Sequence, residues 1–295
     1  MAWAELSDVR CYYEVRGRGD PLLLVPGLGG TCRMWDSVAP LLADTFSVIS
    51  FDNRGLGQSI PRQPARNLRH LAADMAELLD YLQLDRVHVL GLSLGGIIAQ
   101  RFAMDHGPRI DRLVLMSCTD NFTPYLRQIT LLLAHALRRF PKEEFVRTIE
   151  LLGTSPPFLD AHAGEIEKQI RAKCECAPSR GAVAAQLRCL AASDPDPCVP
   201  ITDLPTLILA GEHDALVPNF YARQMAGRIP GSEFHVIAGA GHNPFYECPE
   251  RVVPLIVRFL GSERRGGTRF ASTFMDVIDA VSRDRDGVLL RNGAS

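Results

Sequence analysis

Ser93 stands in a segment whose residue types and spacing indicate nucleophilic catalysis. Residues 91–95 read Gly-Leu-Ser-Leu-Gly, the pattern G-x-S-x-G. They lie between a short apolar run typical of a buried strand and a helical pattern, which is the context this motif requires. A serine held in so sharp a turn needs small residues two positions away on each side, and both are glycine. A serine hydroxyl is a poor nucleophile until a base takes its proton, so the motif needs partners.

His242 and Asp214 are the predicted partners of Ser93. His242 lies in the small-residue segment Gly-Ala-Gly-His-Asn at 239–243, directly after a predicted strand, and Asp214 follows the preceding predicted strand. The acid would fix the tautomer of the imidazole and stabilise its charged form. Asp120, which also follows a strand, is the alternative acid. The chain order serine, aspartate, histidine differs from that of the two other well-known serine triads.

Two backbone N–H groups are predicted to form an oxyanion hole. Leu94 N–H follows the nucleophile, at the start of a helix whose N-terminus carries partial positive charge. Leu28 N–H is the second donor, in the loop Pro-Gly-Leu-Gly-Gly at 26–30. Gly27 and Gly29 flank it and let the backbone approach a substrate closely. No Gly-Lys-Ser/Thr follows, so this is not a phosphate-binding loop, and it lacks the third glycine of a dinucleotide fingerprint.

Aromatic and aliphatic side chains near these loops are candidates for the wall of a substrate pocket. Gly27, Gly29, Trp35 and Phe245 are the predicted substrate-binding residues. Further apolar candidates lie between 121 and 197, although most of them could equally bury the base of that segment: Ile129, Leu131, Leu132, Leu133, Leu137 and Phe158.

Strands and helices must alternate to position these residues. Short continuous apolar runs fit strands buried on both faces, and helical periodicity fills the gaps between them, which together predict a mostly parallel sheet. The N-terminal pair, 3–6 and 11–15, is expected to form an antiparallel edge. The predicted strands end directly before the candidate residues and span 22–25, 46–51, 87–90, 113–116, 206–210 and 233–237.

An all-helical segment interrupts this rhythm between 121 and 197. Four helices are predicted there, at about 123–139, 141–152, 159–176 and 179–192. The chain thus divides into a core at 1–120 and 198–261, a helical cap or lid at 121–197, and a C-terminal extension at 262–295 that is either partly ordered or a docked helix.

Composition favours a soluble cytoplasmic protein that acts on a small molecule. The formal net charge is −2, which gives no basic excess for nucleic acid. There is no signal-peptide pattern, and the apolar runs are too short to span a membrane. The eight cysteines are irregularly spaced, so we expect reduced thiols, and Cys174-x-Cys176 is a poor metal motif. We expect no metal or cofactor, and a monomer or homodimer.

Four motifs in this order resemble the α/β-hydrolase superfamily over about residues 3–260. They are the 26–30 loop, the segment Asp-Asn-Arg-Gly-Leu-Gly-Gln-Ser at 52–59, the Ser93 turn, and the Asp214 and His242 loops. Within the superfamily, the chain is similar to the 3-oxoadipate enol-lactonase and carboxylesterase-like group, although Pro26 stands where a histidine is usual. The resemblance implies the α/β-hydrolase fold: a mostly parallel eight-stranded sheet flanked by helices, with an inserted helical cap.

A serine nucleophile narrows the chemistry. Epoxide hydrolases and haloalkane dehalogenases of this fold use aspartate, because serine would leave a stable ether. Acyl transfer to water is the expected reaction, on an ester, a lactone or a thioester. Three alternatives stay open: C–C bond hydrolysis of a β-diketone, a cofactor-free haloperoxidase or dioxygenase, and a non-catalytic small-molecule receptor. Groups that bind a substrate carboxylate would favour the first, so the positions of Arg127, Arg138 and Arg188 matter.

Overall fold

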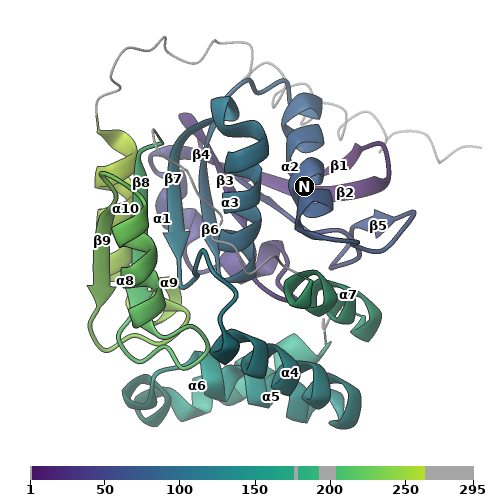
Figure 1. The fold of residues 1–295 in the computed structure, drawn as a ribbon, viewed down its shortest axis with the longest axis vertical. Helices are drawn as coiled ribbons and strands as arrows, with labels where there is room; N and C mark the ends of the chain where they lie inside the picture. Colours follow the sequence, from purple (N-terminus) through teal and green to yellow (C-terminus); the bar gives the residue numbers. More distant parts are fainter. Residues whose placement is uncertain (1, 176–178, 193–203, 263–295) are drawn as a thin grey trace, which may run out of the picture.

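A central sheet organises the chain in the computed structural model, which describes residues 2–175, 179–192 and 204–262 (Figure 1). Eight strands of this part of the chain run in the order β1-β2-β4-β3-β6-β7-β8-β9, and the short β5 pairs with β2. The strands are β1 (Ala2–Glu5), β2 (Val9–Arg16), β3 (Asp20–Val25), β4 (Phe46–Phe51), β5 (Ile60–Pro61), β6 (Val87–Leu92), β7 (Ile110–Met116), β8 (Thr206–Gly211) and β9 (Glu233–Ile237).

The pairing of the strands confirms the predicted sheet. β4, β3, β6, β7, β8 and β9 pair in parallel, whereas β1 and β2 form an antiparallel edge. All six residues of β4, β6 and β8 are buried, which explains why these strands lack polar alternation. Since the parallel strands point the same way, their carboxyl ends meet along one edge of the sheet.

Helices cover both faces of the sheet. Side chains of α2, α3 and α8 pack with Leu23 and Val25 on one face, and those of α1 and α10 pack with Leu22 and Leu24 on the other. Alternate residues of one strand therefore enter two separate cores. The elements outside the helical segment are η1 (Cys32–Trp35), α1 (Ala39–Ala43), α2 (Leu68–Tyr81), α3 (Leu94–His106), η2 (Gly107–Arg109), α8 (Asn219–Arg228), α9 (Pro244–Glu247) and α10 (Pro249–Gly261).

Four helices lie together beyond one end of the sheet, between β7 and β8 in the chain (Figure 1). They are α4 (Pro124–Arg139), α5 (Lys142–Gly153), α6 (Pro156–Glu175) and α7 (Arg180–Ala191). α6 begins three residues earlier than its apolar periodicity suggests, because the Ser155 hydroxyl accepts a hydrogen bond from Phe158 N–H and caps the helix. His162 breaks its helical geometry with φ −126° and ψ 24°.

The helical segment has a hydrophobic core of its own. Side chains from α4, α5 and α7 form one cluster with Leu56, Leu216 and Val217 of the loops at the sheet edge. The helices therefore pack directly on the edge where the candidate site residues lie. The predicted C-terminal extension lies outside the described residues from 263 onward, as does Cys176.

Candidate active site

Ser93 occupies a strained turn between β6 and α3. Its backbone has φ 55° and ψ −121°, a conformation that costs a non-glycine residue about 1–3 kcal/mol and concentrates at functional sites. A Cβ on Gly91 would lie 2.5 Å from the carbonyl oxygen of Gly95, and a Cβ on Gly95 would lie 2.1 Å from that of Val25. The two flanking glycines are therefore sterically required, as the motif predicts.

The loop at 26–30 faces Ser93. Gly30 N–H donates to the carbonyl of Gly27 over 3.0 Å, which closes a turn. Gly29, the third residue of this turn, has φ +69°, a left-handed conformation that favours glycine. A Cβ on Gly27 would lie 3.4 Å from the Cβ of Ser93. Leu28 N–H, the predicted oxyanion donor, thus lies in a turn held against the nucleophile.

His242 and Asp214 form a buried hydrogen-bonded pair. The ring Nδ1 of His242 lies 2.8 Å from Oδ2 of Asp214, and the two residues are 6% and 5% exposed. A carboxylate can only accept hydrogen bonds, so Nδ1 carries the proton and the Nε2 of the neutral ring is free to act as a base. The other oxygen, Oδ1, accepts from Leu216 N–H at 2.9 Å and Val217 N–H at 2.8 Å, which fixes the carboxylate.

Asp120, the alternative acid, has a different partner. Its carboxylate accepts two hydrogen bonds from the Arg228 guanidinium, one of them from Nε at 2.6 Å, and its side chain is fully buried. This pair joins the end of β7 to α8. Asp214 is therefore the acid that faces His242.

The loops that carry Asp214 and His242 are held together by backbone contacts. His213 N–H donates to the carbonyl of Ala240 at 2.8 Å, and a Cβ on Gly211 would lie only 1.8 Å from the carbonyl oxygen of Gly241. Behind them, Oε2 of the buried Glu247 accepts from the N–H groups of Gly241 and Ser155, each at 3.0 Å. Glu247 thus ties the histidine loop to the start of α6.

Three helices of the helical segment each make a hydrogen bond to a different loop that carries candidate site residues. Tyr125 of α4 donates to Ala215 O (2.6 Å), Gly153 O of α5 accepts from His242 N–H (2.9 Å), and Gln186 Oε1 of α7 accepts from Gly29 N–H (2.8 Å). These helices therefore help to position the acid loop, the histidine loop and the oxyanion loop. The sequence did not predict that Gln186, Glu247 or Tyr125 supports these loops. The one signal for Gln186 was that a polar residue stands within an apolar run.

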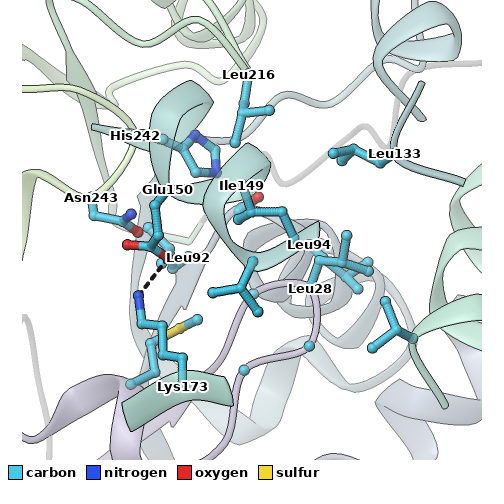
Figure 2. A pocket seen from close by; sticks show the side chains of 18 of the residues that line it. Leu28, Leu92, Leu94, Leu133, Ile149, Glu150, Lys173, Leu216, His242 and Asn243 are labelled. Atoms are coloured by element: carbon cyan, nitrogen blue, oxygen red, sulfur yellow. Dashed lines mark hydrogen bonds and ion pairs between the residues drawn. The ribbon is translucent and has the colours of Figure 1, made fainter. Parts of the chain in front are cut away.

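A cavity of about 580 Å³ lies between the sheet edge and the four helices. Its lining includes Gly27, Leu28, Gly29, Ser93, Leu94, His242 and Phe245. Figure 2 shows His242, Leu216, Leu28, Leu94 and Leu133 around it. The predicted nucleophile and base therefore open into one largely apolar space, together with both predicted oxyanion residues.

Trp35 is a correction to the predicted substrate wall. It is 1% exposed and does not belong to the lining of the cavity, because its ring packs behind Phe245 at a centroid distance of 5.1 Å. Phe245 is thus part of the wall and Trp35 supports it.

The apolar candidates of the helical segment divide in the same way. Ile129, Leu133 and Leu137 line the cavity. Leu131 and Leu132 do not, being 61% and 49% exposed, and the Phe158 ring instead stacks on His162. The cavity lining contains none of Arg127, Arg138 and Arg188.

The segment at 52–59 is a structural support for the oxyanion loop. The buried Asp52 carboxylate accepts from Cys32 N–H and Gln58 N–H, each at 2.7 Å. Arg54 donates two hydrogen bonds to Asp74, of 2.9 and 2.6 Å, and one to Asp8, of 2.8 Å. Burial raises the pKa of Asp74. This segment therefore positions the start of η1 rather than a substrate.

Burial also raises the pKa of several cysteine thiols. It raises the pKa of Cys11 to about 12, and it raises the pKa of Cys32 and Cys189 as well. Thiols with a raised pKa are poor nucleophiles and metal ligands. Within the described ranges, no three His, Cys, Asp or Glu side chains group as they would around a metal ion, and no helix has the length and apolarity to cross a bilayer.

The sequence and the fold of this chain are similar to those of known hydrolases. The alpha/beta hydrolase fold family matches residues 20–249, so the chain belongs to that family. It is 30% identical to a thermophilic esterase from Thermogutta terrifontis, with a TM-score of 0.78 over 88% of this chain and 98% of that one. An enol-lactonase from Burkholderia xenovorans shares the fold at 22% identity, with a TM-score of 0.80 over 88% of this chain and 100% of the other.

Among sequence relatives, the "Putative carbamate hydrolase RutD" of Caulobacter vibrioides is 28% identical over 84% of this chain and 94% of its own length. Together with the family match, these relatives support hydrolase chemistry at the family level.

Proposed function

We propose that this chain is a serine hydrolase that cleaves a carboxylic ester, lactone or thioester of a small molecule through an acyl-enzyme on Ser93. The observation that carries the proposal is the convergence of Ser93 and His242 on one cavity, with His242 held by Asp214 at 2.8 Å. The strained backbone of Ser93 adds to it. The names of the relatives, an esterase and a carbamate hydrolase among them, point to acyl transfer in the same sense.

The first half of the proposed reaction forms the acyl-enzyme. His242 Nε2 takes the Ser93 hydroxyl proton while Oγ attacks the substrate carbonyl carbon. The N–H groups of Leu28 and Leu94 stabilise the negative oxygen of the tetrahedral intermediate. The intermediate collapses with cleavage of the bond to the leaving group, which receives the proton from His242.

The second half releases the acid. Water loses a proton to His242 and attacks the acyl carbon, and the second tetrahedral intermediate expels Ser93 Oγ, which regains its proton from His242. Asp214 stays ionised throughout and stabilises the imidazolium through Nδ1–H. The pathway consumes one water and needs no cofactor.

In this proposal the helical segment acts as a cap. The core then comprises 1–120 and 198–261, and the cap 121–197 covers Ser93 and shapes the cavity through α4, α5 and α7. An apolar cavity suits an aliphatic or aromatic acyl group. The monomeric or homodimeric state and the cytoplasmic location stay predictions from the sequence.

The test compares Ser93→Ala with Ser37→Ala. Ser37 also lines the cavity but lies outside the strained turn, so it is a matched control. We expect Ser93→Ala to abolish hydrolysis of short p-nitrophenyl esters, and Ser37→Ala to keep it. We also expect a fluorophosphonate probe to label the wild type at Ser93, as shown by peptide mass spectrometry. Undiminished turnover by Ser93→Ala would contradict the proposal.

A further inference from the structure

Glu150 is an acid where the wall of the cavity is otherwise largely apolar. It lies on α5, whose inward face also carries Phe145 and Gly153, and its side chain is only 9% exposed. Burying a carboxylate in an apolar wall is unfavourable unless it is paired. Packing alone would be satisfied by an apolar residue at this position. The carboxylate of Glu150 therefore indicates a role inside the cavity.

Lys173 of α6 is the partner of Glu150. Its Nζ donates to Glu150 Oε1 at 2.6 Å, and its side chain is half exposed. Both residues line the cavity, and Figure 2 shows their contact below His242 and Asn243. An ammonium group has three N–H donors and a carboxylate accepts at two oxygens, so one contact leaves both groups with further capacity.

The pair lies on the histidine side of the cavity. Gly153, whose carbonyl accepts from His242 N–H, is three residues after Glu150 and therefore on the same face of α5. A Cβ on Gly153 would lie 3.4 Å from the Asn243 side chain and 3.8 Å from the Cβ of His242. Glu150 is thus about one helical turn, roughly 5 Å, along α5 from the contact with the histidine loop.

We propose that Glu150 and Lys173 form a subsite for the leaving group of the substrate, and that this leaving group is uncharged and carries hydroxyl or amide groups. The inference rests on the proposed function, in which His242 delivers its proton to the leaving group. That group must lie beside the imidazole, on the side where the pair is. The acyl group then occupies the apolar part of the cavity near Leu94 and Leu133 (Figure 2).

The zero net charge of the pair determines the chemistry that it selects. A neutral hydroxyl or amide can accept from Lys173 and donate to Glu150 at the same time. A carboxylate in this position would be attracted by Lys173 but repelled by Glu150, and an ammonium group the reverse, so neither gains a net attraction that offsets its loss of hydration. Charged side chains that also line the cavity are Arg33, Asp36, Lys142 and Arg180. Asp36 pairs with Arg16, and Arg180 donates to two backbone carbonyls.

The experiment measures kcat/KM for four butyrate esters that differ in the leaving group: propyl, 2,3-dihydroxypropyl, a carboxypropyl and an aminopropyl ester. The propyl ester lacks the hydroxyl groups that would bond to the charged pair, so we expect the dihydroxypropyl ester to exceed it in kcat/KM by at least about tenfold. We expect both charged esters to be poorer substrates than the dihydroxypropyl ester.

Single variants should shift this selectivity in opposite directions. Lys173→Met should raise the relative kcat/KM of the aminopropyl ester, and Glu150→Gln that of the carboxypropyl ester. The exchanged double variant, Glu150→Lys with Lys173→Glu, restores a neutral pair and should regain part of the preference for the dihydroxypropyl ester. Thermal unfolding of each variant identifies any that fail to fold. Glu150→Gln should be tolerated best, because the Lys173 that it leaves unpaired is half exposed and stays in contact with water, whereas Lys173→Met leaves a buried carboxylate without its partner.

Two controls separate the possible failures. Turnover of p-nitrophenyl butyrate and fluorophosphonate labelling of Ser93 report on the proposed function alone. If these succeed but wild type and Lys173→Met show the same selectivity, the pair serves only to neutralise a buried acid and the subsite is refuted. If both controls fail in the wild type, the proposed function is refuted, and the subsite with it.

Discussion

Gln186 offers a direct test of whether the helical segment positions the catalytic loops. It lies on α7, is fully buried, and its Oε1 accepts from Gly29 N–H at 2.8 Å across 157 residues of sequence. Gly29 follows Leu28, the predicted oxyanion donor. Gln186→Met keeps nearly the same volume and removes the acceptor, so we expect the turn at 27–30 to lose its fixed orientation.

The expected loss of activity can be bounded. Removing one oxyanion donor altogether costs about 2.7–4 kcal/mol of transition-state stabilisation, a factor of about a hundred or more in kcat. Gln186→Met leaves the Leu28 donor in place but less well aimed, so we expect a smaller loss of roughly 1.4 kcal/mol, or about tenfold in kcat. KM should change less than kcat, because the oxyanion forms only after the substrate has bound.

The assay is steady-state hydrolysis of a p-nitrophenyl ester, with unfolding by urea as a measure of folding. Gln186→Glu is the matched variant, since it retains an oxygen that can accept from Gly29 N–H, and it should keep more kcat than Gln186→Met. Leu187→Met, at a buried neighbouring position on α7, controls for a general change in packing. Wild-type kcat in a folded Gln186→Met variant would refute the idea that α7 positions the oxyanion loop.

Three further substitutions test other parts of the site. Asp214→Asn should lower kcat by about 10⁴-fold, because the amide favours the wrong tautomer of His242. Asp120→Asn should lower the midpoint of urea unfolding with little change in kcat. If instead Asp120→Asn abolishes activity and Asp214→Asn does not, Asp120 is the acid. Glu247→Leu should lower the free energy of unfolding by about 2–4 kcal/mol, since it leaves two buried N–H groups without an acceptor, and an unchanged urea midpoint would show that these groups find other partners.

The elements and the order of the site could be predicted from the sequence because they depend on local signals. Apolar runs buried on both faces define β4, β6 and β8, and Ser93 and Asp214 follow two of these strands. The glycines around Ser93 report a steric requirement that any chain making this turn must meet. The pairing of His242 with Asp214 follows from parallel strands, since neighbouring strands place their carboxyl ends side by side.

Trp35 shows where local signals fail. Its position after the oxyanion loop suggests a pocket wall, but orientation is determined by packing, and the ring is buried behind Phe245. Asp120 and Asp214 both follow strands, and only the partner of each, Arg228 or His242, distinguishes their roles.

The sequence alone therefore determined the fold and predicted the nucleophile and the order in which its partners follow, because each depends on a few neighbouring residues. Only the tertiary structure decided which helix supports which catalytic loop and where the charged pair of the cavity lies. Glu150 with Lys173, and Gly29 with Gln186, are brought together by the crossing of the four helices over the sheet edge. Such contacts are separated by 23 and 157 residues, and no local pattern specifies them.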